Sequence, residues 1–485
     1  MRGAVAASAP RERALALAAV PAAATIAAVA LLLKLVYRPT HLNYDTRYAL
    51  LWAQDLWSGH TPEYRADFAP TPHPLQTALS SLALPLGDHA DRAITWAALL
   101  FFGAVVYLVH RLGAELFSPA AGVVAALVAL TRPVLERDAL LAYQDVAFAA
   151  LILGAVLLEA RRPRRGAPVL GVLAVAGLLR PEAWVLSGLY WLSLWPAAGT
   201  HRRRAALAAI VAVAPLLWAL SDWLVTGDAL HSLHGTAELA EAADRRRRLD
   251  QVPYWTAQYF GNVLREPLVL GVPIGLLFAY HHARRRAILP LAVALAMTAV
   301  FAIGPIFGLP LIGRYLRTPA MLLALFYGLA VCGWALLPPG KPRRRWLAAG
   351  VLAAALSVAF IPKQIDMLQN LHARLSRDGK VYADLHAVAE APAVRAAFAR
   401  CAPLSSADHR PIPHLRYWLD GAPGSVGTVR ADASPLGRLL LVPRATRLAK
   451  GLYKANFPRD VRPPADYRQV YENRSWRLWA APGCA

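Results

Sequence analysis

The segment LNYDTRYALLWAQDLWSGHTPEY, residues 42–64, follows an apolar run and brings acidic, aromatic and amide side chains into a chain dominated by Ala, Leu and Val. After Asp45, apolar and aromatic residues recur at helical spacing, namely Tyr48, Leu51, Trp52, Leu56 and Trp57. This spacing predicts an amphipathic helix over 46–57 that lies in a membrane interface. Asp45 would stand at its N-terminal end, where the helix dipole favours a negative charge, and a plain helix cap explains it equally well.

The composition around this segment predicts an all-α polytopic membrane domain. Hydrophobic residues make up 57% of the 485 residues and charged residues 17%, and the mean hydropathy is +0.37. That is too apolar for a soluble chain of this length. A bilayer core needs about 20 apolar residues per helical span. Runs of this kind predict about eleven spans, near 14–37, 92–110, 113–131, 139–160, 168–180, 182–198, 205–224, 264–281, 287–305, 314–337 and 346–362.

The basic residues predict the topology. The formal net charge is +22, but Arg and Lys fall in short blocks between the apolar runs. They form no stripe beside aromatic residues, which argues against a nucleic-acid partner. The blocks lie at 161–165, 201–204, 281–286 and 340–345. Each fits a cytoplasmic loop under the positive-inside rule, so the N-terminus is expected in the cytoplasm and the first outer loop, 38–91, outside the cell membrane.

The last part of the chain has a different composition. Residues 363–485 lose the apolar runs, and stretches such as RQVYENRSWRLWA, 468–480, alternate in hydropathy. We therefore expect a membrane domain over 1–362 and a small mixed α/β extracytoplasmic domain over 363–485. Outside the cell, Cys401 and Cys484 can form a disulfide or stay unpaired, and the sequence does not decide between these states.

Three features of the first outer loop resemble a known superfamily. An Asp follows the first span, the pattern Y..L.WA..L..G..P.Y comes next, and a Pro-rich PTPHPLQ, 70–76, ends the segment. This order resembles the GT-C fold glycosyltransferases that use lipid-linked sugars. The superfamily includes protein O-mannosyltransferases, the aminoarabinose transferase of lipid A, and actinobacterial arabinosyl- and mannosyltransferases. The resemblance covers residues 14–340 and implies a GT-C-like fold, with Asp45 as the catalytic base.

Further motifs match in order and sidedness. ERDALLAYQDVAFAALIL, 136–153, resembles the second outer loop and the start of the following span, where many relatives carry another acidic residue. By position that residue is Asp145, with Asp138 as the alternative. LLRPEAW, 178–184, and IGRYLRTPA, 312–320, resemble Arg-containing motifs at the outer membrane edge. The resemblance implies that Asp145 is a second catalytic acid. Some relatives bind a divalent metal ion near these acids and others do not, so a metal held by Asp45, Asp145 and His73 stays open.

Sugar transfer from a polyprenyl phosphate needs a base for the acceptor hydroxyl and cations for the leaving phosphate. Guanidinium groups match phosphate oxygens, so the predicted phosphate-binding residues are Arg180, Arg314, Arg317 and the cluster Arg245, Arg246, Arg247 and Arg248. Pairing of Arg180 or Arg314 with Glu182 or Asp145 is an equal alternative. For the cluster, the alternative is a solvated face neutralised by Asp244 and Asp250. Predicted acceptor or loop contacts are Tyr48, Trp52, His73, Glu182 and Asp138.

The sequence thus predicts a membrane glycosyltransferase that moves a sugar, with inversion, to a glycan, lipid or protein acceptor on the outer face. Two other classes stay open: a transporter or flippase of lipid-linked precursors, and a non-catalytic scaffold of envelope synthesis. A transporter is expected to carry its charges near the middle of the membrane on broken helices. Here the charges gather at the outer edge, which favours the enzyme.

Overall fold

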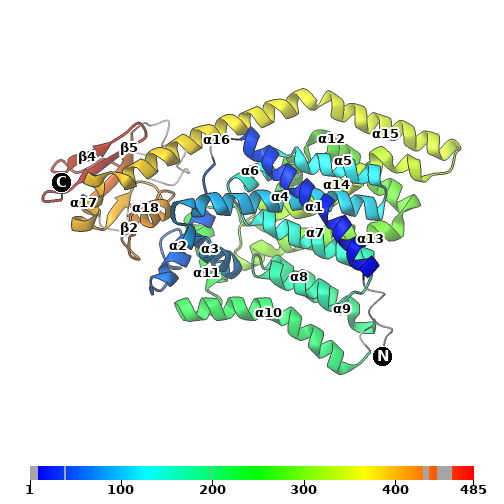
Figure 1. Ribbon diagram of the computed structural model, residues 1–485, viewed down its shortest axis with the longest axis horizontal. Helices are drawn as coiled ribbons and strands as arrows, with labels where there is room; N and C mark the ends of the chain where they lie inside the picture. The colour runs from blue at the N-terminus through cyan, green and yellow to red at the C-terminus, as the bar shows by residue number, and fades with distance from the viewer. Residues whose placement is uncertain (1–8, 38–39, 198, 430–435, 445–460, 485) are drawn as a thin grey trace.

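The computed structural model describes residues 9–37, 40–197, 199–429, 436–444 and 461–484. Its helices form an elongated bundle, with the small sheet domain at one end of the long axis and α15 (Lys341–Ala359) at the other (Figure 1). The helices α2 (Tyr44–Trp57), α3 (Pro74–Ser81) and α11 (His231–Ala242) lie on the side of the bundle that faces the sheet domain (Figure 1). The predicted cytoplasmic N-terminus, residues 1–8, lies outside the described residues.

The helices of the first half are α1 (Ala9–Val36), α2 (Tyr44–Trp57), α3 (Pro74–Ser81), η1 (Leu84–His89), α4 (Ala90–Leu116), α5 (Pro119–Leu130), α6 (Pro133–Leu140), α7 (Asp145–Arg161), α8 (Ala167–Gly177), α9 (Glu182–Leu194), η2 (Trp195–Ala197), α10 (His201–Thr226) and α11 (His231–Ala242). Those of the second half are η3 (Leu249–Gln251), α12 (Val252–His282), α13 (Arg284–Ile303), η4 (Gly304–Phe307), η5 (Gly313–Leu316), α14 (Arg317–Cys332), η6 (Gly333–Leu336), α15 (Lys341–Ala359), α16 (Ile361–Glu390), α17 (Pro392–Cys401) and α18 (Ile412–Trp418). Elements labelled η are 3₁₀ helices.

Each predicted span contains a helix, and the chain is a multi-pass membrane protein. In the described part of the chain, five helical stretches are long and apolar enough to cross a membrane: Leu84–Leu116, His201–Thr226, Leu249–His282, Arg284–Phe307 and Gly313–Leu336. The number rises to seven if the bent pairs α5–α6 and α15–α16 each count as one span. Since α8 is too short to span alone, the total of eleven stays a prediction.

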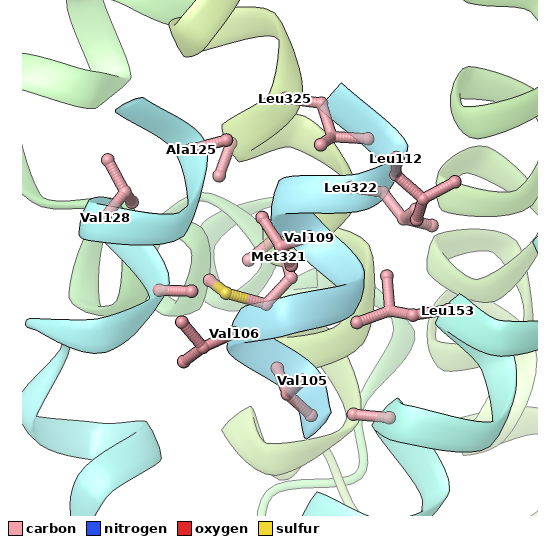
Figure 2. Packing of buried hydrophobic residues seen from close by; sticks show 14 of the residues in the cluster. Val105, Val106, Val109, Leu112, Ala125, Val128, Leu153, Met321, Leu322 and Leu325 are labelled. Carbon is pink, nitrogen blue, oxygen red and sulfur yellow. The ribbon is translucent and has the colours of Figure 1, made fainter. Parts of the chain in front are cut away.

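The bundle core is built on close helix contacts. Figure 2 shows its centre, where α4 packs its valines against α5, α7 and α14. Small residues let these backbones approach closely, as is common in membrane helices. A Cβ on Gly275 of α12 would lie only 1.8 Å from the carbonyl oxygen of Phe326 on α14. Substitution of that glycine would therefore force the two helices apart.

The C-terminal domain is a mixed sheet covered by helices, as predicted. Its strands are β1 (Leu404–Ser406), β2 (Val426–Thr428), β3 (Leu439–Pro443), β4 (Arg468–Glu472) and β5 (Trp476–Ala480), in the order β2-β1-β3-β5-β4. The strand β1 pairs in parallel with β2 and β3, while β5 is antiparallel to β3 and β4. The alternating stretch 468–480 forms β4 and β5. Cys401 and Cys484 are disulfide-bonded, which settles their state in favour of the pair.

The helix α16 connects the two parts. Leu371 and Leu375 belong to the core of the bundle, whereas Val381 and Leu385 belong to the core of the sheet domain. One continuous helix therefore carries the sheet domain and fixes its distance from the bundle.

Candidate functional site

The helix α2 begins just before Asp45, but Asp45 is not its N-cap residue. The Asn43 side chain accepts hydrogen bonds from the backbone N–H groups of Asp45, at 2.8 Å, and Thr46, at 3.1 Å. Asn43 thus fills the N-cap role. The interpretation of Asp45 as a plain helix cap is wrong, because its carboxylate is directed to another part of the chain.

The protein encloses the helix α2 on most of its sides, and its location in the membrane interface stays a prediction. From Thr46 to Ala53 every residue is buried. Tyr48 and Trp52, predicted as acceptor or loop contacts, are each 1% exposed and pack with Tyr64 of the first loop in one hydrophobic cluster. These rings therefore make loop contacts that hold the helix in place.

The segment between α6 and α7 holds the start of α2. The Asn43 backbone N–H donates to the Leu141 carbonyl at 2.9 Å, and the Thr46 hydroxyl donates to the Ala142 carbonyl at 2.7 Å. From the first loop, the Gln76 amide donates to the Thr46 hydroxyl at 2.9 Å. The two loops that the sequence motifs singled out therefore meet at one place.

Asp45 forms an ion pair with Arg314 of η5. The Arg314 Nη1 lies 2.6 Å from the Asp45 Oδ2, and the two side chains are 20% and 19% exposed. Burial opposes ionisation of Asp45, but the Arg314 guanidinium outweighs it and holds the pKa of this carboxyl below its usual value. Asp45 is therefore an ionised carboxylate that stays accessible on one side.

The other predicted acids are also paired with arginine. Arg180 binds both Asp145 and Glu182, and its guanidinium lies 4.4 Å from the centre of the Tyr315 ring. This is the pairing alternative raised for Arg180 above.

Asp138 forms a second buried pair. It binds Arg317 at the start of α14 and its neighbour Arg137, while its own side chain is 1% exposed. Arg180 and Arg317 thus have carboxylate partners, as Arg314 does, and their binding of a donor phosphate stays a prediction.

His73 lies beside this group, and the residues present do not fit a metal site. Burial, followed by the charge of Arg314, lowers the pKa of His73 to about 3, so the imidazole is neutral. The part of the chain that the structure describes holds no group of three or more His, Cys, Asp or Glu residues placed to bind a metal ion. Asp45 and Asp145 each face an arginine. A metal held by Asp45, Asp145 and His73 is therefore not supported.

The arginine cluster separates into one residue that faces the site and three that do not. Arg246 lies over the Trp255 ring at 3.8 Å, Arg247 binds Glu241 at 3.1 Å, and Arg248 binds Asp250 at 2.9 Å. For Arg248 this is the neutralised, solvated alternative.

Arg245 is different from its neighbours. It lies near enough to Asp45 and Arg314 to interact with both electrostatically, and burial lowers the pKa of its guanidinium. Within the described ranges, Arg245 forms no ion pair. The backbone N–H of Leu311 donates to the Arg246 carbonyl at 2.7 Å, which ties this loop to the segment that carries Arg314.

The sheet domain also reaches the site, which sequence reasoning missed. Arg416 of α18 binds Asp55 of α2 at 2.5 Å and Glu63 at 3.3 Å. The ring of His409 packs edge-on against Tyr44, the residue before Asp45, at 5.1 Å. The α18 sequence, IPHLRYW, shows only a single arginine among mostly apolar residues, so the pairing itself requires the tertiary structure.

A cleft of about 460 Å³ opens beside this site. Its walls are residues 64–72 of the first loop and the helix α11 with Asp228 before it. It is not centred on Asp45, but the Tyr44 hydroxyl donates to the carbonyl of Phe68 in its wall, at 2.8 Å. The cleft wall is therefore one hydrogen bond away from the residue before Asp45.

Comparison with known proteins identifies the fold. No protein-family model and no curated protein matches the chain. It is similar to the crystal structure of ArnT from Cupriavidus metallidurans bound to undecaprenyl phosphate, with 16% identity, a TM-score of 0.58, and coverage of 95% of this chain and 98% of that chain. The apo state of ArnT matches with 16% identity, a TM-score of 0.55 and coverage of 96% and 98%.

A third match is the Archaeoglobus fulgidus oligosaccharyltransferase in its apo form, with 12% identity, a TM-score of 0.48 and coverage of 84% and 63%. The chain has the GT-C fold, as the motifs of its outer loops predicted.

Proposed function

We propose that this protein is a membrane glycosyltransferase that transfers a sugar from a polyprenyl-phosphate donor, with Asp45 as the general base. One observation carries the proposal. A partly exposed carboxylate lies against Arg314 and beside Arg245, an arginine without an ion-pair partner in the described residues. The fold shared with ArnT, which was crystallised bound to undecaprenyl phosphate, supports a lipid-phosphate donor.

The proposed reaction is a single displacement with inversion. Asp45 takes the proton of an acceptor hydroxyl, whose oxygen attacks the anomeric carbon while the bond from that carbon to the phosphate oxygen breaks. The leaving phosphate gains negative charge, which Arg245 and Arg314 stabilise through charge-assisted hydrogen bonds. The phosphate also competes with Asp45 for Arg314. Donor binding therefore weakens the ion pair and makes Asp45 a stronger base when it is needed.

Arg180 and Asp145 act indirectly in this proposal. Arg180 is held by Asp145 and Glu182 and lies over Tyr315, next to Arg314 in the chain. This cluster fixes the orientation of η5 and hence of Arg314. Asp138 does the same for the start of α14 through Arg317. Asp145 is therefore proposed as a positioning residue, not as a second catalytic acid.

We place the site on the outer face of the cell membrane, with an envelope glycan, lipid or protein as the acceptor. The Cys401–Cys484 disulfide lies in the domain that contacts α2, and disulfides persist in oxidising compartments. The basic loops between the apolar runs support the same orientation.

The test is sugar transfer by the full chain in lipid nanodiscs from radiolabelled hexose and pentose polyprenyl phosphates. We expect Asp45→Asn to lower transfer by about 100-fold or more with unchanged thermal unfolding, because proton transfer by a positioned base contributes rate of this order. Asp250→Asn, which alters an exposed ion pair with Arg248, serves as the matched control and should keep wild-type transfer. Wild-type transfer by Asp45→Asn would overturn the role of Asp45. No transfer from any donor would favour a lipid carrier or a scaffold.

A further inference from the structure

The cleft beside the site lies between the first loop and α11. It has a volume of about 460 Å³, and its two walls are joined where the hydroxyls of Thr71 and Thr236 hydrogen bond at 2.5 Å. Thr236 is only 9% exposed. A concave site of this size, with polar groups along its walls, is typical of small-ligand binding.

The charge of the cleft is opposite to that of the chain. Its lining includes the carboxylates of Asp67, Asp228 and Glu238 and a single guanidinium, that of Arg65, in a chain of net charge +22. Of these carboxylates, Asp228 pairs with the imidazole of His234 at 2.7 Å. The Arg65 Nη2 donates to the Thr226 carbonyl at 2.7 Å. Carboxylates accept hydrogen bonds from hydroxyl groups and repel phosphates and other carboxylates. The cleft thus favours a ligand that carries hydroxyls and no negative charge.

Aromatic rings add a second feature. Tyr64 stacks on His231 with an interplanar angle of 14°, and both rings line the cleft. Phe68 has a backbone φ of +60°, which is sterically costly for a bulky residue and persists only where the surroundings impose it. Its carbonyl accepts from Tyr44, next to Asp45. The wall of the cleft is therefore fixed by stacked aromatic rings and is tied by one hydrogen bond to the residue before the proposed base.

We propose that this cleft binds the acceptor, and that the acceptor segment is an uncharged glycan. The inference rests on the proposed function only in naming the ligand an acceptor. It separates the two substrates by charge: the donor phosphate lies at Arg245 and Arg314, and the hydroxyl-bearing acceptor lies between the first loop and α11. A glycan end in the cleft presents its hydroxyl toward Asp45.

Gly235 of α11 gives a direct way to fill the cleft. It lines the cavity, and a Cβ added there would lie 3.6 Å from the His231 ring, an ordinary contact. Gly235→Trp therefore places an indole in the cleft without backbone strain, and Gly235→Ala adds one methyl group. Leu233→Trp puts the same indole on α11 at a position that does not line the cleft.

The experiment measures binding of neutral manno- and gluco-oligosaccharides, and of their carboxylate-bearing counterparts, to the full chain in nanodiscs. We expect neutral oligosaccharides to bind more tightly than the carboxylate-bearing ones. Gly235→Trp should weaken this binding about tenfold or more, Gly235→Ala much less, and Leu233→Trp should bind like the wild type. Undecaprenyl phosphate binding should be the same in all variants.

The proposal is overturned if the carboxylate-bearing oligosaccharides bind more tightly, if Gly235→Trp binds like the wild type, or if no oligosaccharide binds. Failure of the proposed function has a different signature. In that case undecaprenyl phosphate binding or sugar transfer is absent from the wild type, while oligosaccharide binding and its loss in Gly235→Trp can still be measured.

Discussion

Two carboxylates of the same helix, Asp45 and Asp55, both form ion pairs with an arginine from a distant part of the chain, yet their surroundings differ. Asp45 and Arg314 are 19% and 20% exposed, whereas Asp55 and Arg416 are 5% and 1% exposed. Arg416 also binds Glu63 and the carbonyls of Gly421 and Ala422.

The difference in exposure suggests different roles: one pair attaches the sheet domain, and the other belongs to the proposed catalytic site. We call Asp55 and Arg416 the closed pair: protein groups accept hydrogen bonds from the Arg416 guanidinium, and the pair holds the sheet domain on α2. We call Asp45 and Arg314 the open pair: both side chains are partly exposed and Arg245 lies near them, so the proposed donor phosphate can enter there. Burial raises the pKa of Asp55 despite Arg416, whereas Arg314 keeps the pKa of Asp45 low. If the two pairs have these roles, substitutions in the closed pair should change stability, and substitutions at the open pair should change substrate affinity.

The largest expected effect is on the closed pair. Arg416→Met should destabilise the protein by about 3–5 kcal/mol, because it leaves Asp55 buried without its partner. The measurement is thermal unfolding in nanodiscs. Asp55→Leu combined with Arg416→Met should recover most of this loss, since both buried charges are then removed. A single variant as stable as the wild type would show that this pair does not hold the domain.

Removal of the disulfide should act on the same side of the comparison. Cys401→Ser with Cys484→Ser frees a loop with a sequence separation of 83 residues and should cost about 2–4 kcal/mol. Protection of the sheet domain from proteolysis measures this loss. Equal loss of protection in α4 would contradict a local effect, because the disulfide lies in the core of the sheet domain alone.

The open pair should respond in substrate affinity instead of stability. Arg245→Ala should raise the KM for the lipid-linked donor about tenfold, because a charge-assisted contact to phosphate is lost, with little change in thermal unfolding. Arg248→Ala is the control, since its exposed pair with Asp250 contributes little. Equal effects of both substitutions would mean that the cluster acts only through its summed charge.

The smallest effect concerns pH. Since Arg314 lowers the pKa of Asp45, the acid limb of kcat/KM should lie below about 3.9, the ordinary Asp value. The base form is present above the folded pKa and is lost as the pH falls through it. Arg314→Gln removes the largest opposing charge, so the effect of burial gains weight, the pKa of Asp45 rises and the limb should move upward. A wild-type limb above the ordinary range would contradict the Asp45 assignment.

Much of the fold and part of the site were predictable from local patterns. Apolar runs located the helices, period-two alternation located β4 and β5, and the order of motifs indicated the GT-C fold. The Asn43 cap was also visible in the sequence, since Asn is a preferred N-cap residue, but Asp45 was considered for the role instead. The burial of Tyr48 and Trp52 was missed because helical spacing does not reveal how many faces of a helix are covered.

The sequence by itself determined the class of protein, because membrane partition is a sum of transfer free energies, residue by residue, that needs no knowledge of neighbours. It also determined which polar residue types lie between the apolar runs. Only the tertiary structure decided which arginine each carboxylate binds. Asp45 and Arg314 are 269 residues apart in the chain, and Asp55 and Arg416 are 361 apart. An ion pair depends on separation and burial at the ångström scale, and helix packing sets both.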